Sequence, residues 1–176
     1  MQFLPEIKTI ADKLTAVGYR TYMTGKWHLG GEGESLPDQH GFEESFIFDA
    51  SGADNWEEKS YMPYYGEVPW YENGTRASLP KDFYSSKFIV DKMIEYLDQN
   101  GQNPFFSYLA FQAVHIPVQV SPEYRDRYEG IYSGGWEQLR EDRFQKAKKV
   151  GLIFEDAELV PQPAEFRSWS QLDESK

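Results

Sequence analysis

The sequence predicts an α/β fold, with a mainly parallel or mixed sheet flanked by helices, on three observations. Helical patterns at 5–17 and 83–101 are each followed by a segment rich in strand-forming residues. The segment 105–113 is apolar almost throughout, which is typical of a strand buried on both faces of a parallel sheet. A chain of 176 residues that is 40% hydrophobic is long and apolar enough to bury the core of one domain.

The first helix–strand unit opens the chain. Residues 5–17 carry apolar side chains at steps of three, four and three, which places them on one helical face: Ile7, Ile10, Leu14 and Val17. Pro5 suits the first turn of this helix, and Gly18 suits its C-terminal cap. The segment 19–25 then predicts a short strand, because it is rich in β-branched and aromatic residues.

The second unit repeats this order. Residues 83–101 predict a helix with apolar side chains at four-residue steps: Ile89, Met93 and Leu97. Ser85 or Ser86 is the expected N-cap, and Gly101 is the expected stop. The apolar segment 105–113 follows as its strand.

Other parts of the chain are less regular. Residues 45–51 predict a third short strand, and 135–150 predict an exposed amphipathic helix. Residues 52–82 are rich in Gly, Pro, Tyr and Trp and predict an ordered excursion that faces substrate.

Composition limits the function. The net charge of −11 argues against nucleic acid as a partner, because phosphate contacts need clustered Lys and Arg. No segment is long and apolar enough for a membrane span, and Met1–Ile10 does not have the pattern of a secretory signal peptide. The absence of cysteine excludes disulfides, thiolate metal sites and cysteine nucleophiles within these residues. The oligomeric state is not encoded in any pattern.

Polar residues follow two of the predicted strands. Lys26 and His28 come after the first strand, and His115 comes after the strand at 105–113. Ligands of open α/β sheets bind at the carboxyl ends of strands, so the three side chains converge if the two strands are neighbours. Alternation along an extended backbone places Lys26 and His28 on one side, with Trp27 pointing away. One ammonium and two imidazoles would suit an anionic ester.

Each residue also has a simpler interpretation. A lone lysine is normally a solvated surface group, and His115, between two apolar residues, could be a core histidine. His40 lies in turn-like sequence and is expected to be a surface or structural residue. The spacing therefore suggests a site without identifying its chemistry.

The segment GYRTYMTGKWHLG, residues 18–30, resembles the second signature of the sulfatases. Residues 36–48 resemble the family's stretch that leads to a G-F-D-x-F-F-G element. Residues 105–124 resemble its strand followed by a histidine–x–proline segment, and 132–153 resemble a segment of bacterial arylsulfatases. The resemblance covers roughly 5–165 in a consistent order and implies an alkaline-phosphatase-like sulfatase fold.

The resemblance implies roles for three residues. Lys26 would stabilise the nucleophile and the sulfate charge, and His28 would accept a proton when the sulfated intermediate breaks down. His115 would contact the sulfate and help to protonate the leaving alcohol or phenol. In the family the nucleophile is a hydrated formylglycine, made from the first residue of a C/S-x-P-S-R motif, and a Ca²⁺ ion polarises the sulfate.

The sequence departs from this pattern. It contains no C/S-x-P-S-R segment and no Asp-Asp pair, and Asp54-Asn55 falls in the wrong place for the family's calcium ligands. We therefore expect residues 1–176 to be a partial sulfatase catalytic domain, an internal fragment without the nucleophile or metal ligands. Its full-length parent would hydrolyse small sulfate esters, while the isolated chain would be inactive.

Two alternatives remain open. One is a phosphodiesterase or phosphonate monoester hydrolase of the same superfamily, and the other is a non-catalytic binding module with inherited motifs. These residues do not encode the compartment, although the resemblance is compatible with a periplasmic or secreted protein.

Overall fold

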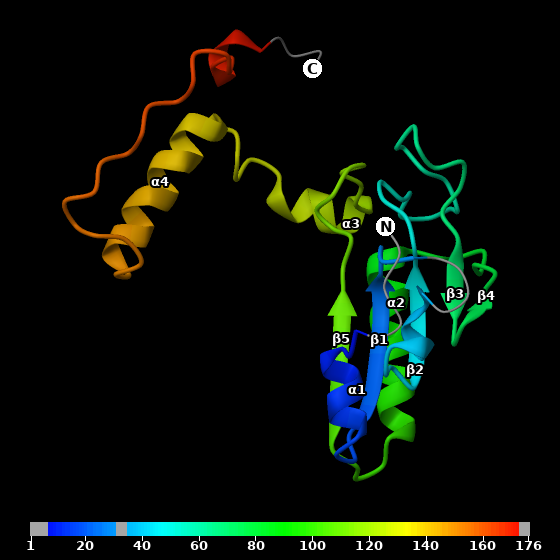
Figure 1. The fold of residues 1–176 in the computed structure, drawn as a ribbon. Coiled ribbons are helices and arrows are strands. Elements are labelled where there is room, and N and C mark those ends of the chain that lie inside the picture. Colours follow the sequence, from blue (N-terminus) through cyan, green and yellow to red (C-terminus); the bar gives the residue numbers. More distant parts are fainter. Residues whose placement is uncertain (1–6, 31–34, 173–176) are drawn as a thin grey trace. The chain divides into compact units, whose positions relative to one another are not determined.

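A computed structural model describes residues 7–30 and 35–172, and its five strands form one mixed sheet (Figure 1). The strand order is β4-β3-β2-β1-β5. The strands are β1 Arg20–Lys26, β2 Glu44–Phe48, β3 Trp70–Glu72, β4 Thr75–Arg76 and β5 Phe105–Ala110. β1 pairs in parallel with both β2 and β5, while β3 pairs antiparallel with β2 and β4. The predicted α/β class with a mixed sheet is confirmed.

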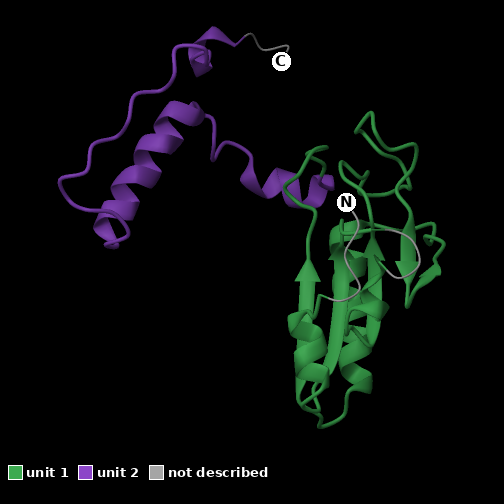
Figure 2. Ribbon diagram, viewed as in Figure 1, with its two compact units in different colours: residues 1–119 green, residues 120–176 purple. Residues whose placement is uncertain are grey.

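The helices fall into two compact units, residues 1–119 and residues 120–176 (Figure 2). The first unit contains α1 Ile10–Thr15, the 3₁₀ turn η2 Pro37–Gln39 and α2 Ser85–Gln99. The second contains α3 Pro122–Arg125, η3 Asp126–Tyr128, α4 Gly135–Lys149 and η4 Trp169–Gln171. Within the described ranges, none of these helices is both long and apolar enough to cross a membrane.

Helix α1 begins later than the sequence predicted. Thr9 is its N-cap, and Thr9 and Asp12 form a capping box in which each side chain accepts a hydrogen bond from the other's backbone N–H. The predicted start at Pro5 lies outside the described residues. The prediction that Gly18 caps the C-terminus is wrong, because Ala16 is the C-cap. Gly18 lies two residues further on, with a φ of 91° and its N–H donating to the Thr15 carbonyl at 3.0 Å.

Helix α2 is present, but the prediction that a serine caps it is wrong. Tyr84 is the N-cap and makes no capping hydrogen bond with its side chain. Ser85 is the first helical residue, and both its hydroxyl and its backbone N–H donate to Asn55. The serine therefore ties the helix start to the 52–82 excursion instead of capping the helix.

Alternation along the two central strands builds a core on each face of the sheet. Tyr22 of β1 and Phe46 of β2 pack on the α2 side, with Ile89 of that helix. Met23 and Ile47, the next residues along these strands, pack on the opposite face with Ala11 of α1. Both strands are thus buried on both faces, as a parallel arrangement requires.

Strand β5 differs from its prediction. It pairs in parallel with β1, as expected, but among the described residues it lies at the edge of the sheet. The side chains of Phe105 and Tyr108 remain 48% and 49% exposed. The predicted burial on both faces is wrong, because apolar composition does not reveal whether a second strand or helix covers the segment.

The 52–82 excursion contains a hairpin that the sequence analysis missed. Strands β3 and β4 join through Asn73 and Gly74, both at positive φ. An Asn-Gly pair is a strong signal for a two-residue hairpin turn. The hairpin buries Trp70 fully, with its ring 4.8 Å from that of Phe48.

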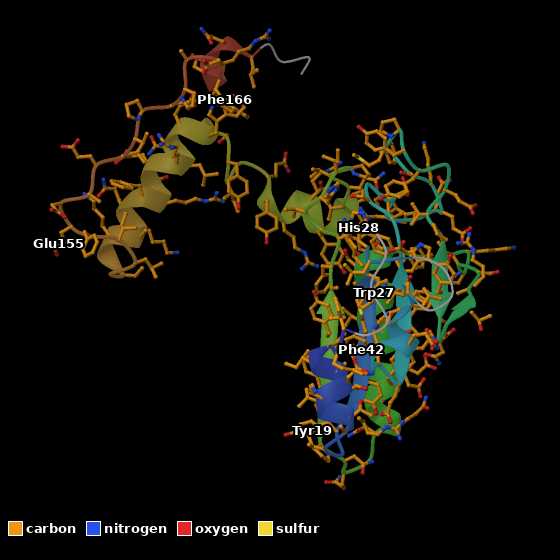
Figure 3. All side chains as sticks on the ribbon, in the orientation of Figure 1. Tyr19, Trp27, His28, Phe42, Glu155 and Phe166 are labelled. Atoms are coloured by element: carbon orange, nitrogen blue, oxygen red, sulfur yellow. The ribbon has the colours of Figure 1, made fainter. Side chains whose placement is uncertain are left out.

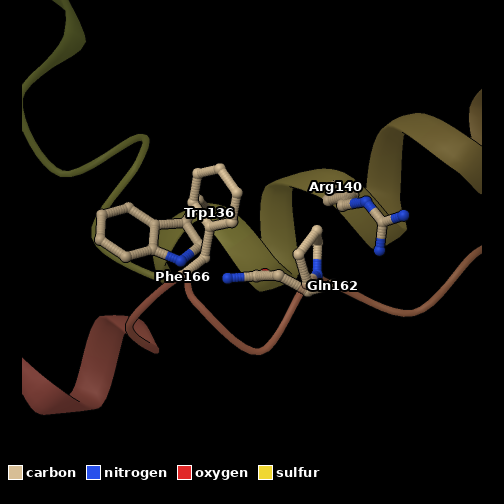
Figure 4. Close-up of a pocket in the computed structure, with 5 residues that line it drawn as sticks. Trp136, Arg140, Gln162 and Phe166 are labelled. Atoms are coloured by element: carbon tan, nitrogen blue, oxygen red, sulfur yellow. The ribbon is translucent and has the colours of Figure 1, made fainter.

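The second unit forms around α4, which confirms the helix predicted at 135–150. The ring of Trp136 meets that of Trp169 edge to face at 5.2 Å. A cavity of about 500 Å³ lies between α4 and the following segment (Figure 4). Its lining residues are Trp136, Arg140, Gln162, Pro163 and Phe166.

Candidate active site

Three parallel strands, β2, β1 and β5, end at the same edge of the sheet (Figure 1). Lys26 is the last residue of β1, Ser51 follows the end of β2, and His115 follows the end of β5. The carboxyl edge of a parallel sheet is where ligands bind in open α/β folds. This edge is therefore the candidate site.

Ser51 joins two of the residues that the sequence predicted to converge. The Lys26 ammonium donates a hydrogen bond to Ser51 Oγ at 3.2 Å, and Ser51 Oγ lies 3.2 Å from His115 Nε2. His115 Nδ1 lies 2.8 Å from the Ile116 carbonyl oxygen. A carbonyl only accepts, so in the neutral ring Nδ1 carries the hydrogen and Nε2 accepts one from Ser51. Serine then accepts from the lysine and donates to the histidine.

His28 lies at the same end of β1 but makes a separate contact (Figure 3). Its Nε2 is 2.9 Å from the Tyr65 hydroxyl. Its φ of 58° takes it out of the extended backbone, so strand alternation does not govern its direction. Trp27 packs on the α1 side as expected, where its Nε1 donates to the Ser35 carbonyl at 2.7 Å.

The positive groups influence one another. Partial burial lowers the pKa of Lys26. Burial is the largest cause that lowers the pKa of His28, and the ammonium of Lys26 adds to this effect, while the carboxylate of Asp49 opposes it. His28 is therefore a neutral imidazole at neutral pH and can accept a proton there.

Gly25 permits the close approach of strands on which the site depends. Its φ is 102°, and a Cβ built at this position would lie 2.0 Å from the Ala110 carbonyl oxygen. Only glycine combines this backbone conformation with so short a distance. The residue before Lys26 thus allows β1 to stay paired with the end of β5.

Two residues at the site escaped the sequence analysis. Ser51 had a usable signal, because it ends the segment predicted as a third strand, and the carboxyl end of that strand shares the sheet edge. Tyr65 had no local signal beyond lying in the aromatic 52–82 excursion. Only the fold brings it to His28.

His40 is a structural residue. It is 1% exposed, and its ring stacks on that of Trp27 at 6.1 Å between centroids. Its backbone carbonyl accepts a hydrogen bond from the Thr9 hydroxyl at 2.7 Å. Of the two interpretations left open for His40, the structural one is confirmed.

The described residues do not fit a calcium site. Within 7–30 and 35–172, no group of three or more His, Cys, Asp or Glu residues is arranged to hold a metal ion. The carboxylate of Asp54 is already surrounded by protein donors: the backbone N–H groups of Trp56 and Glu57, the Tyr61 hydroxyl and the Gln119 amide. Its oxygens are therefore committed to protein hydrogen bonds.

Comparison with known proteins agrees across sequence and structure. A family model described as Sulfatase matches residues 3–166. The chain is 35% identical over 181 residues to an uncharacterized sulfatase of Schizosaccharomyces pombe, covering 96% of this chain and 31% of that protein. It is 30% identical over 167 residues to an arylsulfatase of Klebsiella aerogenes, covering 90% of this chain and 35% of that protein. The chain thus spans about a third of the length of these relatives.

A solved structure, Ps i-CgsB in complex with k-i-k-neocarrahexaose, is similar to this chain with a TM-score of 0.64 and 25% identity. The match covers 74% of this chain and 32% of that one. A second, BT4656 in complex with D-glucosamine-2-N,6-O-disulfate, has a TM-score of 0.53 at 25% identity and covers 76% of this chain and 23% of that one.

Proposed function

This chain belongs to the sulfatase family, and on that premise we propose that it supplies part of the active site of a sulfuric ester hydrolase. The observation that carries the proposal is the hydrogen-bonded chain Lys26–Ser51–His115 at the carboxyl edge of the sheet. It gathers a cation, a hydroxyl and an imidazole where an anionic ester would bind. The proposed substrate class is a small sulfate ester.

Lys26 is proposed to face the sulfate group. Its ammonium is partly buried and donates to the neutral Ser51 hydroxyl, and within residues 7–30 and 35–172 no carboxylate forms an ion pair with it. A positioned charge in a partly dry site stabilises negative charge that develops in a transition state better than the same charge in water.

His115 is proposed to give a proton to the leaving alcohol or phenol. The Ile116 carbonyl holds Nδ1–H, so the proton that can be transferred is the one at Nε2. In the resting ring Nε2 carries no proton and accepts a hydrogen bond from Ser51. His115 must therefore first take up a proton at Nε2 and become an imidazolium. Ser51 then turns its hydrogen away and accepts from Nε2.

His28 is proposed to take up a proton when the covalent intermediate breaks down. Its lowered pKa keeps the ring neutral at pH 7, as a general base requires. If Nε2–H donates to the Tyr65 oxygen, the lone pair of Nδ1 is available to accept the proton. Tyr65 would then fix which nitrogen is the base.

The family is metal-dependent in general, and we propose Ca²⁺ as the metal of the complete enzyme. The described residues do not form a site for this ion, and the roles proposed for Lys26, His28 and His115 do not involve it. We place the formylglycine nucleophile outside these 176 residues, because the sequence has neither a cysteine nor an S-x-P-S-R segment.

The test begins with the DNA on both sides of this reading frame. The continuous frame is expressed and assayed with 4-nitrophenyl sulfate and, for comparison, bis(4-nitrophenyl) phosphate. Lys26→Ala, His28→Ala and His115→Ala are each expected to lower kcat for the sulfate ester about 100-fold or more. Lys81→Ala, at an exposed position, is the control and should leave kcat unchanged.

Two outcomes would overturn the proposal. One is a frame closed by stop codons on both sides, with no turnover from the chain. The other is a continuous frame whose product prefers the phosphate diester, which would favour a phosphodiesterase of the same superfamily.

A further inference from the structure

Two glutamines bracket the segment that carries His115, and each binds two residues of the segment 53–55. At one end, the Gln112 amide donates to the Ala53 carbonyl at 2.7 Å and to Asn55 Oδ1 at 3.1 Å. At the other end, the Gln119 amide donates to Asp54 Oδ2 at 2.8 Å, and Gln119 Oε1 accepts from the Asn55 backbone N–H at 2.9 Å. The loop 112–119 is therefore held at both ends by side-chain hydrogen bonds.

The three residues that receive these bonds are themselves fixed. Asp54 and Asn55 are 4% and 3% exposed, and Gln112 is 7% exposed. Ser85, the first residue of α2, donates to Asn55 twice: from its hydroxyl to Oδ1 at 2.5 Å and from its backbone N–H to the carbonyl at 2.8 Å. The 53–55 segment is thus anchored to a helix whose own face is part of the core.

Packing alone does not hold the histidine loop. His115 is exposed, and its neighbours Val114 and Ile116 are 87% and 54% exposed. Among the residues that the structure describes, few apolar contacts therefore restrain the imidazole. The loop has one internal backbone bond near its start, from the His115 N–H to the Gln112 carbonyl at 2.8 Å.

We infer that Gln112 and Gln119 are positioning residues that orient His115 toward Ser51 by clamping its loop to residues 53–55. Ser51 lies two residues before Ala53, so the segment that receives the clamp also carries the hydroxyl that meets His115 Nε2. The same contacts give the Asp54-Asn55 pair its role, which is to receive the clamp. The catalytic role of His115 rests on the proposed function, whereas the orientation of its ring by the two glutamines does not depend on that function.

The test reads the imidazole directly. The 176-residue chain has three histidines, His28, His40 and His115, so ¹⁵N-labelled histidine gives three resolvable pairs of ring nitrogens. Gln112→Ala and Gln119→Ala are expected to move the His115 shifts toward those of free histidine exchanging between tautomers. The buried ring of His40 should be unaffected. Gln102→Ala, at an exposed position of the same unit, is the control and should move none of them.

A charge exchange keeps the test valid where an alanine variant fails to fold. Gln119→Glu removes the donor to Asp54 and sets two carboxylates together, while it keeps the acceptor for the Asn55 N–H. Gln119→Glu should move the ¹⁵N chemical shifts of the His115 ring. The double variant Asp54→Asn/Gln119→Glu should restore them, because the amide at position 54 then donates to the carboxylate at position 119.

The inference is overturned if His115 keeps its wild-type shifts in a folded Gln112→Ala, Gln119→Ala or Gln119→Glu variant. It is also overturned if the double variant fails to restore them. None of these readouts needs turnover, so loss of the proposed sulfatase function would appear separately, in the assay of the continuous frame.

Discussion

Ser51 Oγ lies 3.2 Å from His115 Nε2, although 64 positions separate the two residues along the chain. Ser51 follows β2 and His115 follows β5, and these strands flank β1 on either side. The contact therefore closes over the end of β1, where Lys26 donates to the same hydroxyl. Ser51 is buried and His115 is exposed, so the serine is the fixed end of the contact.

The first prediction concerns this serine. Ser51→Ala removes the hydrogen bonds to Lys26 and His115, and the free energy of unfolding should fall by about 1 kcal/mol. Urea unfolding of the purified chain measures the change. Ser78→Ala, at an exposed position, should change it by less than about 0.5 kcal/mol. Equal effects of the two substitutions would contradict a stabilising role for the Ser51 hydroxyl.

The second prediction concerns the charge beside His28. Lys26→Met keeps the length of the side chain and removes its charge, so the pKa of His28 should rise toward its ordinary value near 6.5. Burial remains the larger cause, so the recovery should be partial. NMR titration of the His28 ring measures it, with Lys81→Met as the control. An unchanged His28 pKa in Lys26→Met would show that the two groups do not interact.

The third prediction is a pH dependence of stability. Burial by itself raises the pKa of Asp54, but hydrogen bonds from Gln119, Trp56 and other donors outweigh it and hold the pKa below its ordinary value near 3.8. A lowered folded-state pKa stabilises the protein above the unfolded-state value, and this stabilisation is lost as the pH falls through the folded-state value.

Asp54→Asn should therefore destabilise the chain more at pH 7 than at pH 3, as measured by urea unfolding at both values. Asp82→Asn, at an exposed position, serves as the reference. A cost of Asp54→Asn that does not change between the two pH values would refute the assignment.

The fourth prediction tests the approach of β1 to β5. Gly25→Ala forces a Cβ against the Ala110 carbonyl and strains a positive φ, so stability should fall by at least about 2 kcal/mol. Gly66→Ala is the matched control, because a Cβ there would meet no atom within 4 Å. Thermal unfolding distinguishes them. Similar melting temperatures for the two variants would mean that β1 and β5 are not paired in this register.

The fifth prediction concerns turnover. The 176 residues by themselves should release no 4-nitrophenol from 4-nitrophenyl sulfate above the buffer rate, because they contain no residue that fits the family's nucleophile motif. Release of even one equivalent per chain would show that another nucleophile is present. A preparation of the Klebsiella arylsulfatase, assayed in parallel, provides the positive control.

The sequence by itself determined the two long helices and three candidate site residues. The apolar spacing along α2 encodes a buried face, which is a local property, so this helix was predictable. The helix α4 was also predicted, but its Trp136 stays 38% exposed and Gly135 is the only residue of α4 that is buried. Lys26, His28 and His115 were predictable as candidates because each follows a predicted strand and lies in a segment that resembles the sulfatases.

Only the tertiary structure decided which strands are neighbours and what covers them. The pattern of apolar residues along a strand shows which faces can be buried, but not which strand pairs beside it. The sequence therefore predicted β5 as a buried strand, although it lies at the edge of the described sheet. For the same reason, Ser51 and Tyr65 could not be assigned to the site from local pattern. Their contacts join residues far apart in the chain, and these depend on strand order and on the path of the 52–82 excursion.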